Sequence, residues 1–510
     1  MRKIAIFLIF SCLSVSLIAQ DTVHFFTFGG LQNDGCKQVM SVSDGGYIMI
    51  GTTNTFGTGN TDFYAIKTDS LCHFEWSKCY GGPVNEEGFS VTPTLDKGFA
   101  FVGFTDSYTG NGYDVFLVKT DSLGNMKWQK AYGGKDWDFG YSVKQLKDSG
   151  YVICGTTYSY GKGNGDMYIV RTDKMGDTLW TKTVGDKGYE VGNALTVVND
   201  SIYLIAGGTT STLNADTNAC VVKIIDRGTY GYLKSNWIYR SHHNSIFYSI
   251  RNVSDKGFVM YGSSDSIPDS IKSSAYTDEY CLKIDSNGVQ KWCQLIHFTA
   301  ACVGKDAVEL SDHSILSIAS INGGGGGGYD FHDQRFDAGG GWLQASTLGA
   351  AKDELAGSIA IGKNGDLIFA GSSDSYPTFS VGLFDVFMVR IKATDTLPLS
   401  YDTVVHKFLD TTQWPAAIPN QEHKVGVKVF PNPVVSSFTI LIQGEDGGKY
   451  TLNLFNINGQ CLIQDVPLKS VGHGQAAVVI ERNNLAAGTY GYEIISQGKT
   501  KVGSGKIIME

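Results

Sequence analysis

The chain has 510 residues, of which 42% are hydrophobic, 12% are aromatic and 63 are glycines. A chain of this length forms two or three domains with a large core, and its glycine and aromatic content suits an all-β protein with many turns. The formal net charge is −9, and the sequence has no basic patch, which argues against nucleic acid as a partner.

Residues 1–19 have the pattern of a secretory signal peptide. Two basic residues precede an apolar run that ends at Ile18, and the small residue Ala19 follows. No other segment approaches the length of a transmembrane helix. We therefore expect an exported protein without a transmembrane segment. As an alternative, Cys12 would be acylated as in a lipoprotein, although the residues before it match such a site only loosely.

Tryptophan recurs every 52 residues at Trp76, Trp128 and Trp180. Fixed spacing of this kind indicates stacked copies of one supersecondary unit. Each copy contains four short apolar or alternating runs separated by Gly, Asn and Asp turns, which predicts a four-stranded meander. Four strands in each repeat are typical of a β-propeller blade.

The third strand of the unit can be followed through seven copies. It begins at Asp62, Asp114, Asp166, Asn218, Asp278, Asp330 and Asp385. Five positions on, every copy has a basic residue, namely Lys67, Lys119, Arg171, Lys223, Lys283, Arg335 and Arg390. The sequence therefore predicts a seven-bladed β-propeller over residues 20–395.

A tryptophan-bearing fourth strand follows six of the seven copies, the last of them with Trp342, and none follows Arg390. Residues 23–30 align with this fourth strand and have no preceding strands of their own. We expect them to complete the seventh blade, because joining the two ends of the propeller in one sheet removes an exposed edge. The tryptophans are expected in the core.

One face of the disc is predicted to carry acidic and aromatic side chains. The loop entering the innermost strand has the acids Asp34, Glu86, Asp138, Glu190 and Asp353, and the loop after the second strand has the aromatics Phe56, Tyr108, Tyr160 and Tyr376. A glycan would pack its rings on the aromatics and bond its hydroxyls to the carboxylates. The structural alternative is that the acids accept N–H bonds in the turns and the aromatics cover the neighbouring blades.

Blade six breaks the repeat. A run of glycines spans 323–328, and the following strand replaces apolar positions with His332 and Asp333, next to Arg335. These three residues are the candidates for an asymmetric site, and the alternative is a degenerate blade. The third-strand aspartates are expected to hold the preceding loops. One carboxylate in each blade supplies far fewer oxygen ligands than a calcium ion requires. We predict no metal or cofactor.

Nine cysteines follow Cys12, at positions 36, 72, 79, 154, 220, 281, 293, 302 and 461. Their odd number and spacing fit neither a zinc site nor a disulfide scaffold. Cys281 and Cys293 flank one hairpin turn and are the one candidate pair for a disulfide. The alternative is that cysteines within apolar strands are small hydrophobic residues.

Residues 396–424 contain interrupting prolines and no repeat, and predict a linker. Residues 425–510 form a different all-β unit with alternating strands and Gly/Asn turns. This pattern predicts a small antiparallel, immunoglobulin-like β-sandwich. Its landmarks, in order, are Pro431, Asn432 and Pro433, then Gly459, then Leu485, Gly488 and Tyr490, and finally Lys506.

These landmarks closely resemble the C-terminal sorting domain of the type IX secretion system of Bacteroidetes. The resemblance implies partners, namely the outer-membrane translocon and a surface protease that removes the domain. It also implies a location at the outer-membrane surface or outside the cell. The propeller copies are similar to Bacteroidetes propeller repeats, in which the pattern of 44–53 and 119–128 recurs, although blades four to six depart from it.

The sequence contains no catalytic signature such as HExxH, GxSxG, a P-loop or the sialidase Asp-box. Three hypotheses remain. The propeller is a glycan- or protein-binding module at one face of the disc, or a polysaccharide lyase or glycoside hydrolase with a site at the channel mouth, or a surface or adhesion scaffold without a discrete site. Fold alone does not choose among them.

Overall fold

A computed structural model describes residues 23–30, 32–108, 112–211, 216–239, 244–265, 277–296, 300–323, 327–375 and 384–392, and then 426–430, 437–443, 450–455, 461–472, 475–481, 485, 488–496 and 501–509. The predicted signal peptide (1–19) and the predicted linker (396–424) lie outside these residues. The chain divides into two compact units, Met1–His406 and Lys407–Glu510. Within the described residues, no helix is long and apolar enough to cross a membrane.

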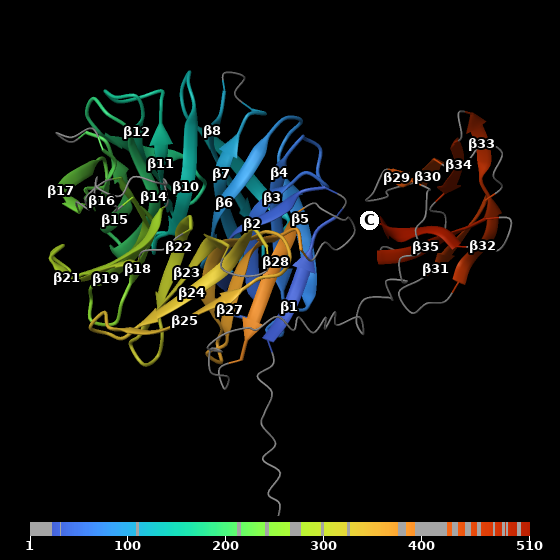
Figure 1. The fold of residues 1–510 in the computed structure, drawn as a ribbon. Helices are drawn as coiled ribbons and strands as arrows, with labels where there is room; N and C mark the ends of the chain where they lie inside the picture. The colour runs from blue at the N-terminus through green and yellow to red at the C-terminus, as the bar shows by residue number, and fades with distance from the viewer. Residues whose placement is uncertain are drawn as a thin grey trace, which may run out of the picture. The chain divides into compact units, whose positions relative to one another are not determined.

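The first unit consists of seven four-stranded antiparallel sheets, which confirms the predicted seven-bladed propeller (Figure 1). Each sheet runs from an innermost to an outermost strand. Blades one to four are β2 (Asp34–Ser41), β3 (Tyr47–Thr53), β4 (Asp62–Thr68) and β5 (Phe74–Tyr80); β6 (Glu86–Pro93), β7 (Phe99–Thr105), β8 (Asp114–Thr120) and β9 (Met126–Tyr132); β10 (Asp138–Gln145), β11 (Tyr151–Thr157), β12 (Asp166–Thr172) and β13 (Thr178–Val184); β14 (Glu190–Asn199), β15 (Ile202–Thr209), β16 (Asn218–Asp226) and β17 (Gly231–Tyr239).

The remaining blades follow the same order around the ring. They are β18 (Ser245–Asn252), β19 (Phe258–Ser264), β20 (Asp278–Ile284) and β21 (Gln290–Ile296); β22 (Cys302–Glu309), β23 (Ile315–Asn322), β24 (Tyr329–Phe336) and β25 (Trp342–Leu348); and β26 (Glu354–Ile361), β27 (Leu367–Ser373), β28 (Asp385–Ile391) and β1 (Val23–Phe28). In the seventh sheet, β1 pairs along its whole length with β28, from Val23 opposite Ile391 to Phe28 opposite Val386. The first strand of the propeller thus completes its last blade.

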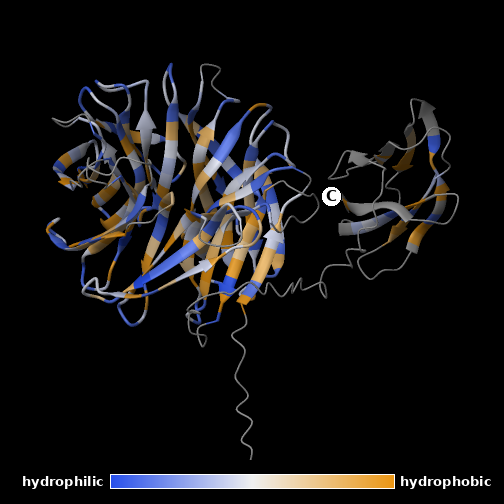
Figure 2. Ribbon diagram, viewed as in Figure 1, coloured by the Kyte–Doolittle hydropathy of each residue, from blue (hydrophilic) through white to orange (hydrophobic). Residues whose placement is uncertain are grey.

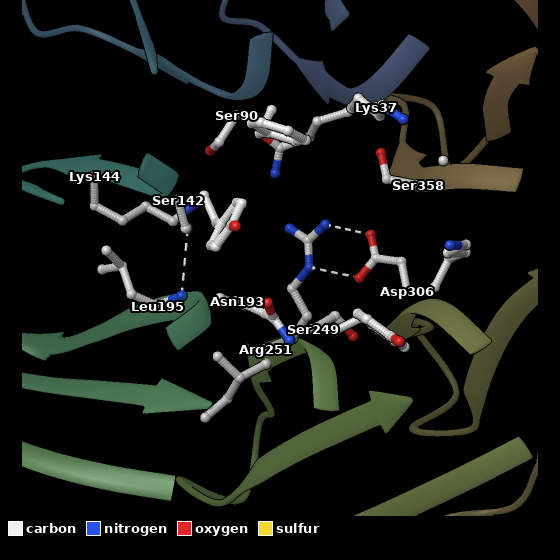
Figure 3. Close-up of a pocket in the computed structure, with 18 residues that line it drawn as sticks. Lys37, Ser90, Ser142, Lys144, Asn193, Leu195, Ser249, Arg251, Asp306 and Ser358 are labelled. Atoms are coloured by element: carbon white, nitrogen blue, oxygen red, sulfur yellow. Dashed lines mark hydrogen bonds and ion pairs between the residues drawn. The ribbon is translucent and has the colours of Figure 1, made fainter. Parts of the chain in front are cut away.

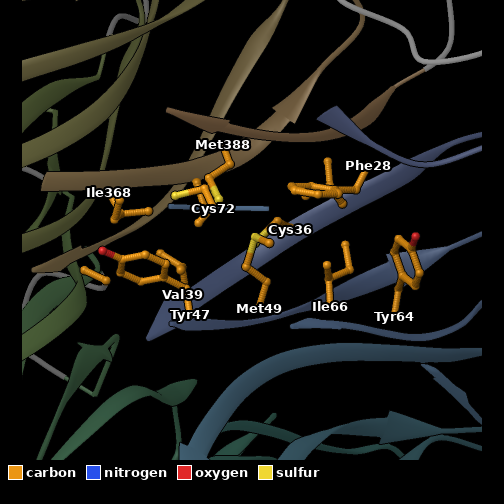
Figure 4. Packing of buried hydrophobic residues seen from close by; sticks show 13 residues of the cluster. Phe28, Cys36, Val39, Tyr47, Met49, Tyr64, Ile66, Cys72, Ile368 and Met388 are labelled. Carbon is orange, nitrogen blue, oxygen red and sulfur yellow. The ribbon is translucent and has the colours of Figure 1, made fainter. Parts of the chain in front are cut away.

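The core lies between neighbouring blades. The second and third strands of blade two are buried at every position, and hydrophobic residues concentrate along such strands while the turns are hydrophilic (Figure 2). One cluster joins blades one and seven, where Met49 and Ile66 pack with Ile368 and Met388 (Figure 4). Burial of apolar surface across each blade interface therefore stabilises the closed ring.

The recurring basic residue of the third strand forms an ion pair with an acid in the turn between the first two strands. The pairs are Lys67–Asp44, Lys119–Asp96, Arg171–Asp148, Lys283–Asp255, Arg335–Asp312 and Arg390–Asp366. In blade four, Lys223 instead lies 5.9 Å from the centre of a Trp237 ring. The basic residues belong to the scaffold.

The outer-strand tryptophans pack on the next blade. Trp76 covers Gly124, where an added Cβ would lie 2.7 Å from its ring, and Trp180 is 5% exposed. The expectation of a core tryptophan is wrong for Trp342, which is 62% exposed. In blade six the residue opposite the cation Arg335 is Gln344, so Trp342 occupies a position two residues earlier in the strand.

Cys281 and Cys293 do not form a disulfide, because both are free thiols. Cys281 lies opposite Gln294, and Cys293 lies opposite Leu282. Since successive side chains of a strand point to opposite faces, the two thiols belong to different core clusters. The alternative interpretation as small hydrophobic residues therefore holds for Cys281.

The second unit is a small antiparallel sandwich, as predicted. One sheet has the order β29 (Gly426–Phe430), β30 (Ser437–Gln443), β34 (Gln475–Glu481) and β33 (Lys469–Gly472), and the other has β32 (Cys461–Pro467), β31 (Tyr450–Phe455), β35 (Gly488–Ser496) and β36 (Lys501–Met509). Leu452, Leu454, Ile440 and Ile494 form the centre of its core.

Candidate functional site

The predicted acidic ring is buried. Asp34, Glu86, Asp138 and Glu190 are at most 4% exposed, and each accepts a hydrogen bond from the backbone N–H four residues earlier. Each also accepts a hydroxyl hydrogen bond from the strand or loop beside it. These carboxylates hold the turns of the scaffold, and burial raises the pKa of Asp34 and Asp138.

In the seventh blade, the acid at this position differs from the predicted one. Glu354, not Asp353, lies opposite Ser373 in the ladder position of the other acids. Its carboxylate accepts hydrogen bonds from Ala350 N and Ser373 Oγ, and burial raises its pKa. Asp353 lies one residue earlier, where it accepts a hydrogen bond from the N–H of Tyr329.

The predicted aromatics are separate caps on their own blades. Phe56, Tyr108 and Tyr160 are 41%, 44% and 46% exposed, and Tyr108 stacks on Phe116 with ring centres 5.3 Å apart. The hydroxyls of Tyr108 and Tyr160 donate to backbone carbonyls in the adjacent loops. Tyr376 lies outside the described residues. The structure therefore does not gather these aromatics into one patch.

The three candidates of blade six are divided between two environments. His332 and Asp333 are 6% and 5% exposed, and burial lowers the pKa of His332 to about 4 and raises that of Asp333 to about 7. Asp333 accepts a hydrogen bond from Ser346. Arg335 instead binds Ser314 and Asp312 at the edge of the blade. None of the three lines the cavity described below.

His332 belongs to a polar cluster between blades five and six. At its centre, Glu279 is fully buried and its pKa is raised to about 7 by that burial. The side chains that donate to its carboxylate are Tyr261, Cys302 and Gln334. With its carboxylate satisfied by these donors and closed to solvent, this cluster is part of the blade interior.

A solvent-open cavity of about 100 Å³ lies where the seven innermost strands meet (Figure 3). Every blade contributes to it. The lining residues are Lys37 and Gln38; Phe89 and Ser90; Tyr141, Ser142 and Lys144; Asn193, Ala194 and Leu195; Tyr248, Ser249, Ile250 and Arg251; Lys305 and Asp306; and Gly357 and Ser358. This cavity is the central channel of the propeller.

A belt of polar side chains ties neighbouring blades together around the channel. Each member accepts a hydrogen bond from a backbone N–H of the adjacent innermost strand. The bonds join Gln38 Oε1 to Val91 N (2.7 Å), Ser90 Oγ to Val143 N (3.3 Å), Ser142 Oγ to Leu195 N (3.3 Å), Asp306 Oδ2 to Ile359 N (3.2 Å) and Ser358 Oγ to Val39 N (2.8 Å). These hydrogen bonds link neighbouring strands of the channel wall, while the lysine and aromatic side chains face the cavity.

Four cationic side chains and one carboxylate line the channel. Arg251 donates to both oxygens of Asp306, at 3.2 and 2.6 Å, and its guanidinium lies in the middle of the ring of strands (Figure 3). Among the described residues, no carboxylate forms an ion pair with Lys37, Lys144 or Lys305. The channel therefore carries an excess of positive charge in an acidic protein.

The pKa values of two channel lysines reflect this charge. Burial, with the nearby charge of Arg251, lowers the pKa of Lys144 to about 8. Burial and the charge of Lys37 lower the pKa of Lys305 to about 8. Since the attraction of an anion between these side chains would offset the cost of desolvation and the repulsion between cations, the arrangement favours a negatively charged ligand.

Aromatic rings share the wall with these cations. Phe89 and Tyr141 meet edge to face with ring centres 5.3 Å apart, and the ammonium of Lys305 lies 5.3 Å from the centre of the Tyr248 ring. Convergent charged groups among aromatic side chains are typical of ligand sites. Within the described residues, no group of three His, Cys, Asp or Glu side chains is placed to hold a metal ion.

The channel residues were not predicted from the sequence. Seven of them, one from each blade, come three positions after the first residue of the innermost strand, at Lys37, Phe89, Tyr141, Asn193, Tyr248, Lys305 and Gly357. A bulge next to this position interrupts the ladder between the two innermost strands of each blade. In the sequence, this position could have been recognised because its residue type varies among the blades while the residues around it repeat.

In the second unit, the described landmarks belong to the sandwich itself. Tyr490 is 7% exposed in the core, and Leu485 packs against that core. Gly488 begins β35 opposite Met509, and Lys506 in β36 lies opposite Gly491. Pro431, Asn432, Pro433 and Gly459 lie outside the described residues.

Residues 428–510 match the family model of the secretion system C-terminal sorting domain. Curated proteins give no match. Solved structures similar to the chain include a protein of unknown function from Dyadobacter fermentans (10% identity, 72% of this chain and 99% of that chain, TM-score 0.42) and the β-propeller domain of the Trilobed protease from Pyrococcus furiosus (9% identity, 74% and 100%, TM-score 0.41). Scores of this size carry no inference about ligand or activity.

The sorting domain has direct consequences for the location of the chain. It implies interaction with the type IX secretion system and export to the cell surface or outside the cell. The chain thus joins a seven-bladed propeller to an export signal, and residues 428–510 are a type IX secretion C-terminal sorting domain.

Proposed function

We propose that the chain is an exported binding protein whose propeller holds a negatively charged ligand in its central channel. The observation that carries this proposal is the set of three lysines, Lys37, Lys144 and Lys305, that line the channel without a carboxylate partner among the described residues. Charged groups of one sign in a cavity with low-dielectric walls concentrate the field and attract ligands of the opposite sign.

The Arg251–Asp306 pair supports the same function in a different way. The bidentate contact fixes the guanidinium in one orientation, and a planar fork of this kind keeps its remaining donors available in fixed directions. An incoming carboxylate or sulfate group would therefore meet one oriented guanidinium and three ammonium groups.

The C-terminal unit supplies the export step of the proposal. As in the family it resembles, residues 428–510 are recognised by the outer-membrane translocon, and a surface protease then removes them. Deletion of 428–510 should leave the propeller inside the outer membrane, which cell fractionation would detect. Secretion of the truncated chain at the normal level would contradict this role.

The binding proposal is tested with a panel of anionic probes on the purified chain. The panel contains polyglutamate and fragments of polygalacturonate, alginate and chondroitin sulfate, measured by calorimetry at two salt concentrations. We expect at least one probe to bind, with an affinity that falls with salt and falls about tenfold or more in Lys37→Ala/Lys305→Ala.

A matched control removes the same charge elsewhere. Lys174 and Lys187 are exposed and do not line the channel, so Lys174→Ala/Lys187→Ala should bind as the unmodified chain does. Equal losses in the two double variants would show that only net charge matters. Absence of binding to every probe would contradict the proposal and favour a scaffold without a discrete site.

A second candidate, a polysaccharide lyase, is favoured by one observation. Lys144 has a lowered pKa next to Arg251 in the open channel, and a lysine of this kind can act as a general base. It would take the proton beside a uronate carboxylate, and the electron pair of that C–H bond would form a C=C bond. The adjacent glycosidic C–O bond would break, with its electron pair leaving on the oxygen, which takes up a proton from water. The unsaturated product absorbs ultraviolet light, so a steady rise in absorbance that Lys144→Ala abolishes would establish the activity.

A hydrolase with paired carboxylates is less compatible with the channel. Such enzymes need two carboxyl groups that flank the scissile bond. Asp306 is the one carboxylate among the described lining residues, and Arg251 occupies both of its oxygens. The geometry therefore favours ligand binding as the function, with elimination by a lyase as the second candidate.

A further inference from the structure

Blade three departs from the repeat at two loop positions that face each other. In all seven blades a backbone N–H after the second strand donates to a backbone C=O before the innermost strand. The residue pairs, acceptor first, are Asn33–Asn54, Asn85–Asp106, Trp137–Tyr158, Tyr189–Thr210, Asn244–Asp265, Ala301–Asn322 and Asp353–Asp374, with N to O distances from 2.7 to 3.1 Å. Because the backbone contact is the same in every blade, the scaffold does not require the aromatic pair of blade three.

The aromatic pair is exposed. Trp137 is 53% and Tyr158 is 41% exposed, and their rings meet nearly at right angles with centres 6.5 Å apart. Tyr189 from the next blade extends the group, at 6.2 Å from Tyr158. We call Trp137, Tyr158 and Tyr189 the aromatic platform. Large rings left partly in water at positions that are mostly polar elsewhere mark a contact surface.

The scaffold holds the platform in place from one side. Trp137 meets Tyr113 edge to face, with ring centres 5.6 Å apart. It also covers Gly112, where an added Cβ would lie 2.6 Å from Trp137 Cδ1. A ring fixed by its neighbours loses little conformational entropy when a ligand packs on its free face, which is why rigid aromatics are effective anchors.

The platform is continuous with the channel. Trp137 directly precedes β10, and Phe139 and Tyr141 lie within it. The ring centres are 6.4 Å apart for Trp137 and Phe139 and 6.1 Å apart for Phe139 and Tyr141. Tyr141 lines the channel that contains the lysines. A ligand longer than one residue can therefore contact the aromatic platform and the channel cations together.

We infer that the ligand is an acidic oligosaccharide, with one sugar ring packed on the aromatic platform and an acidic group among Lys37, Lys144 and Lys305. This inference rests on the proposed binding of an anion in the channel and names the class of that ligand. A pyranose ring presents a flat C–H face that packs on indole and phenol rings, and hydroxyls that bond to polar groups at its edge.

The exposed polar side chains next to Trp137 fit a sugar. Lys135 and Asp136 are exposed in the same loop, and charged side chains of this kind can bond to the hydroxyls of a sugar. An acidic peptide would satisfy the lysines but does not itself supply flat apolar faces for the platform. The combination of rings and cations thus selects a charged sugar over a charged peptide.

The test compares two variants on matched probes with the full chain. Trp137→Asn/Tyr158→Asn recreates the pair found in blade one, Asn33 and Asn54, which the repeat accommodates. Trp342→Asn is the control, because Trp342 is 62% exposed and lies on the outer strand of blade six. Calorimetry measures binding of polygalacturonate, alginate and chondroitin sulfate fragments, of methyl-esterified oligogalacturonate, and of polyglutamate.

We expect the platform variant to bind the acidic oligosaccharide about tenfold more weakly or worse, and Trp342→Asn to bind it normally. Polyglutamate, where it binds at all, should be insensitive to the platform variant. If the platform variant binds every acidic oligosaccharide as the unmodified chain does, while Lys37→Ala/Lys305→Ala loses binding, the inference is overturned and the channel proposal stands. The same conclusion follows if polyglutamate binds as tightly as the best sugar.

The remaining outcomes separate the two claims further. Binding of methyl-esterified oligogalacturonate as tight as that of its acid form, lost only in the platform variant, would support the platform and contradict the anion site. Absence of binding to all probes would overturn both claims. A change in thermal unfolding of the platform variant, measured in parallel, would reveal a folding defect, and the single variant Trp137→Asn would then replace it.

Discussion

Lys119 and Asp96 form an ion pair with an Nζ to Oδ1 distance of 2.9 Å, although 23 residues separate them in the chain. The lysine is almost fully buried while the aspartate is half exposed. The same relation between a third-strand cation and a turn acid recurs in six of the seven blades. In these six blades, the contact fixes the turn to the third strand.

Asp96→Asn should lower the free energy of unfolding by about 1.5–3 kcal/mol, because it removes a charged acceptor from a buried lysine. Hydrogen bonds from Thr94, Lys119 and Lys127 hold the pKa of Asp96 below its usual value of 3.8. The stabilisation is therefore present above pH 4 and is lost as the pH falls and the carboxylate is protonated. Urea unfolding at pH 7 and pH 3 measures this, and exposed Asp136→Asn is the control. A constant difference between variant and unmodified chain at both pH values would contradict the account.

Gly124→Ala should destabilise the propeller more than Gly228→Ala. Both glycines have positive φ, +77° and +82°, so each substitution costs about 1–2 kcal/mol of backbone strain. At Gly124 the new Cβ also meets the Trp76 ring, whereas nothing lies within 4 Å at Gly228. Overpacking adds about 1–3 kcal/mol, and denaturant unfolding should show this difference. Equal losses would mean that Trp76 moves freely.

Trp180→Ala and Trp342→Ala separate a core tryptophan from an exposed one. Trp180 is 5% exposed, and its Nε1 donates to Asp226 at 3.0 Å, so its truncation should cost about 3–5 kcal/mol. Trp342 is 62% exposed, so its truncation should change stability within about 0.5 kcal/mol. Thermal unfolding of the two variants tests this, and similar shifts would contradict the assignment of Trp342 to the surface.

Binding of an anionic ligand in the channel should weaken above about pH 8. Lys144 and Lys305 have pKa values of about 8, and the anion favours their protonated forms. The affinity is thus full below this pH and falls as the pH rises and the ammonium groups lose their protons. Lys144→Arg/Lys305→Arg should retain binding at high pH, since arginine stays charged. An affinity that is constant between pH 7 and pH 10 in the unmodified chain would contradict the role of these lysines.

The regular part of the molecule was predictable because repetition exposes it. The spacing of Trp76 and Trp128 gave the blade, and the third-strand positions gave seven copies. Where the repeat is ambiguous, strand register decides: of the adjacent acids Asp353 and Glu354, only Glu354 lies opposite Ser373. One residue of offset turns a side chain to the other face of a strand.

The candidate site was not predictable for the opposite reason. Recurring residues such as Asp34 and Lys119 hold the scaffold, whereas the channel residues Lys37, Tyr141 and Lys305 stand at one position whose residue type varies among the blades. Only the closed ring brings them together, since they come from distant parts of the chain. The partner of Lys119 was also missed, although its separation of 23 residues repeats in several blades.

The location of a bound acidic oligosaccharide is the most direct test of the central claim. A crystal structure of the chain with the tightest-binding acidic fragment should show an acidic group within hydrogen-bonding distance of at least two of Lys37, Lys144 and Lys305. Density for the fragment elsewhere on the propeller, with an empty channel at saturating concentration, would contradict the claim.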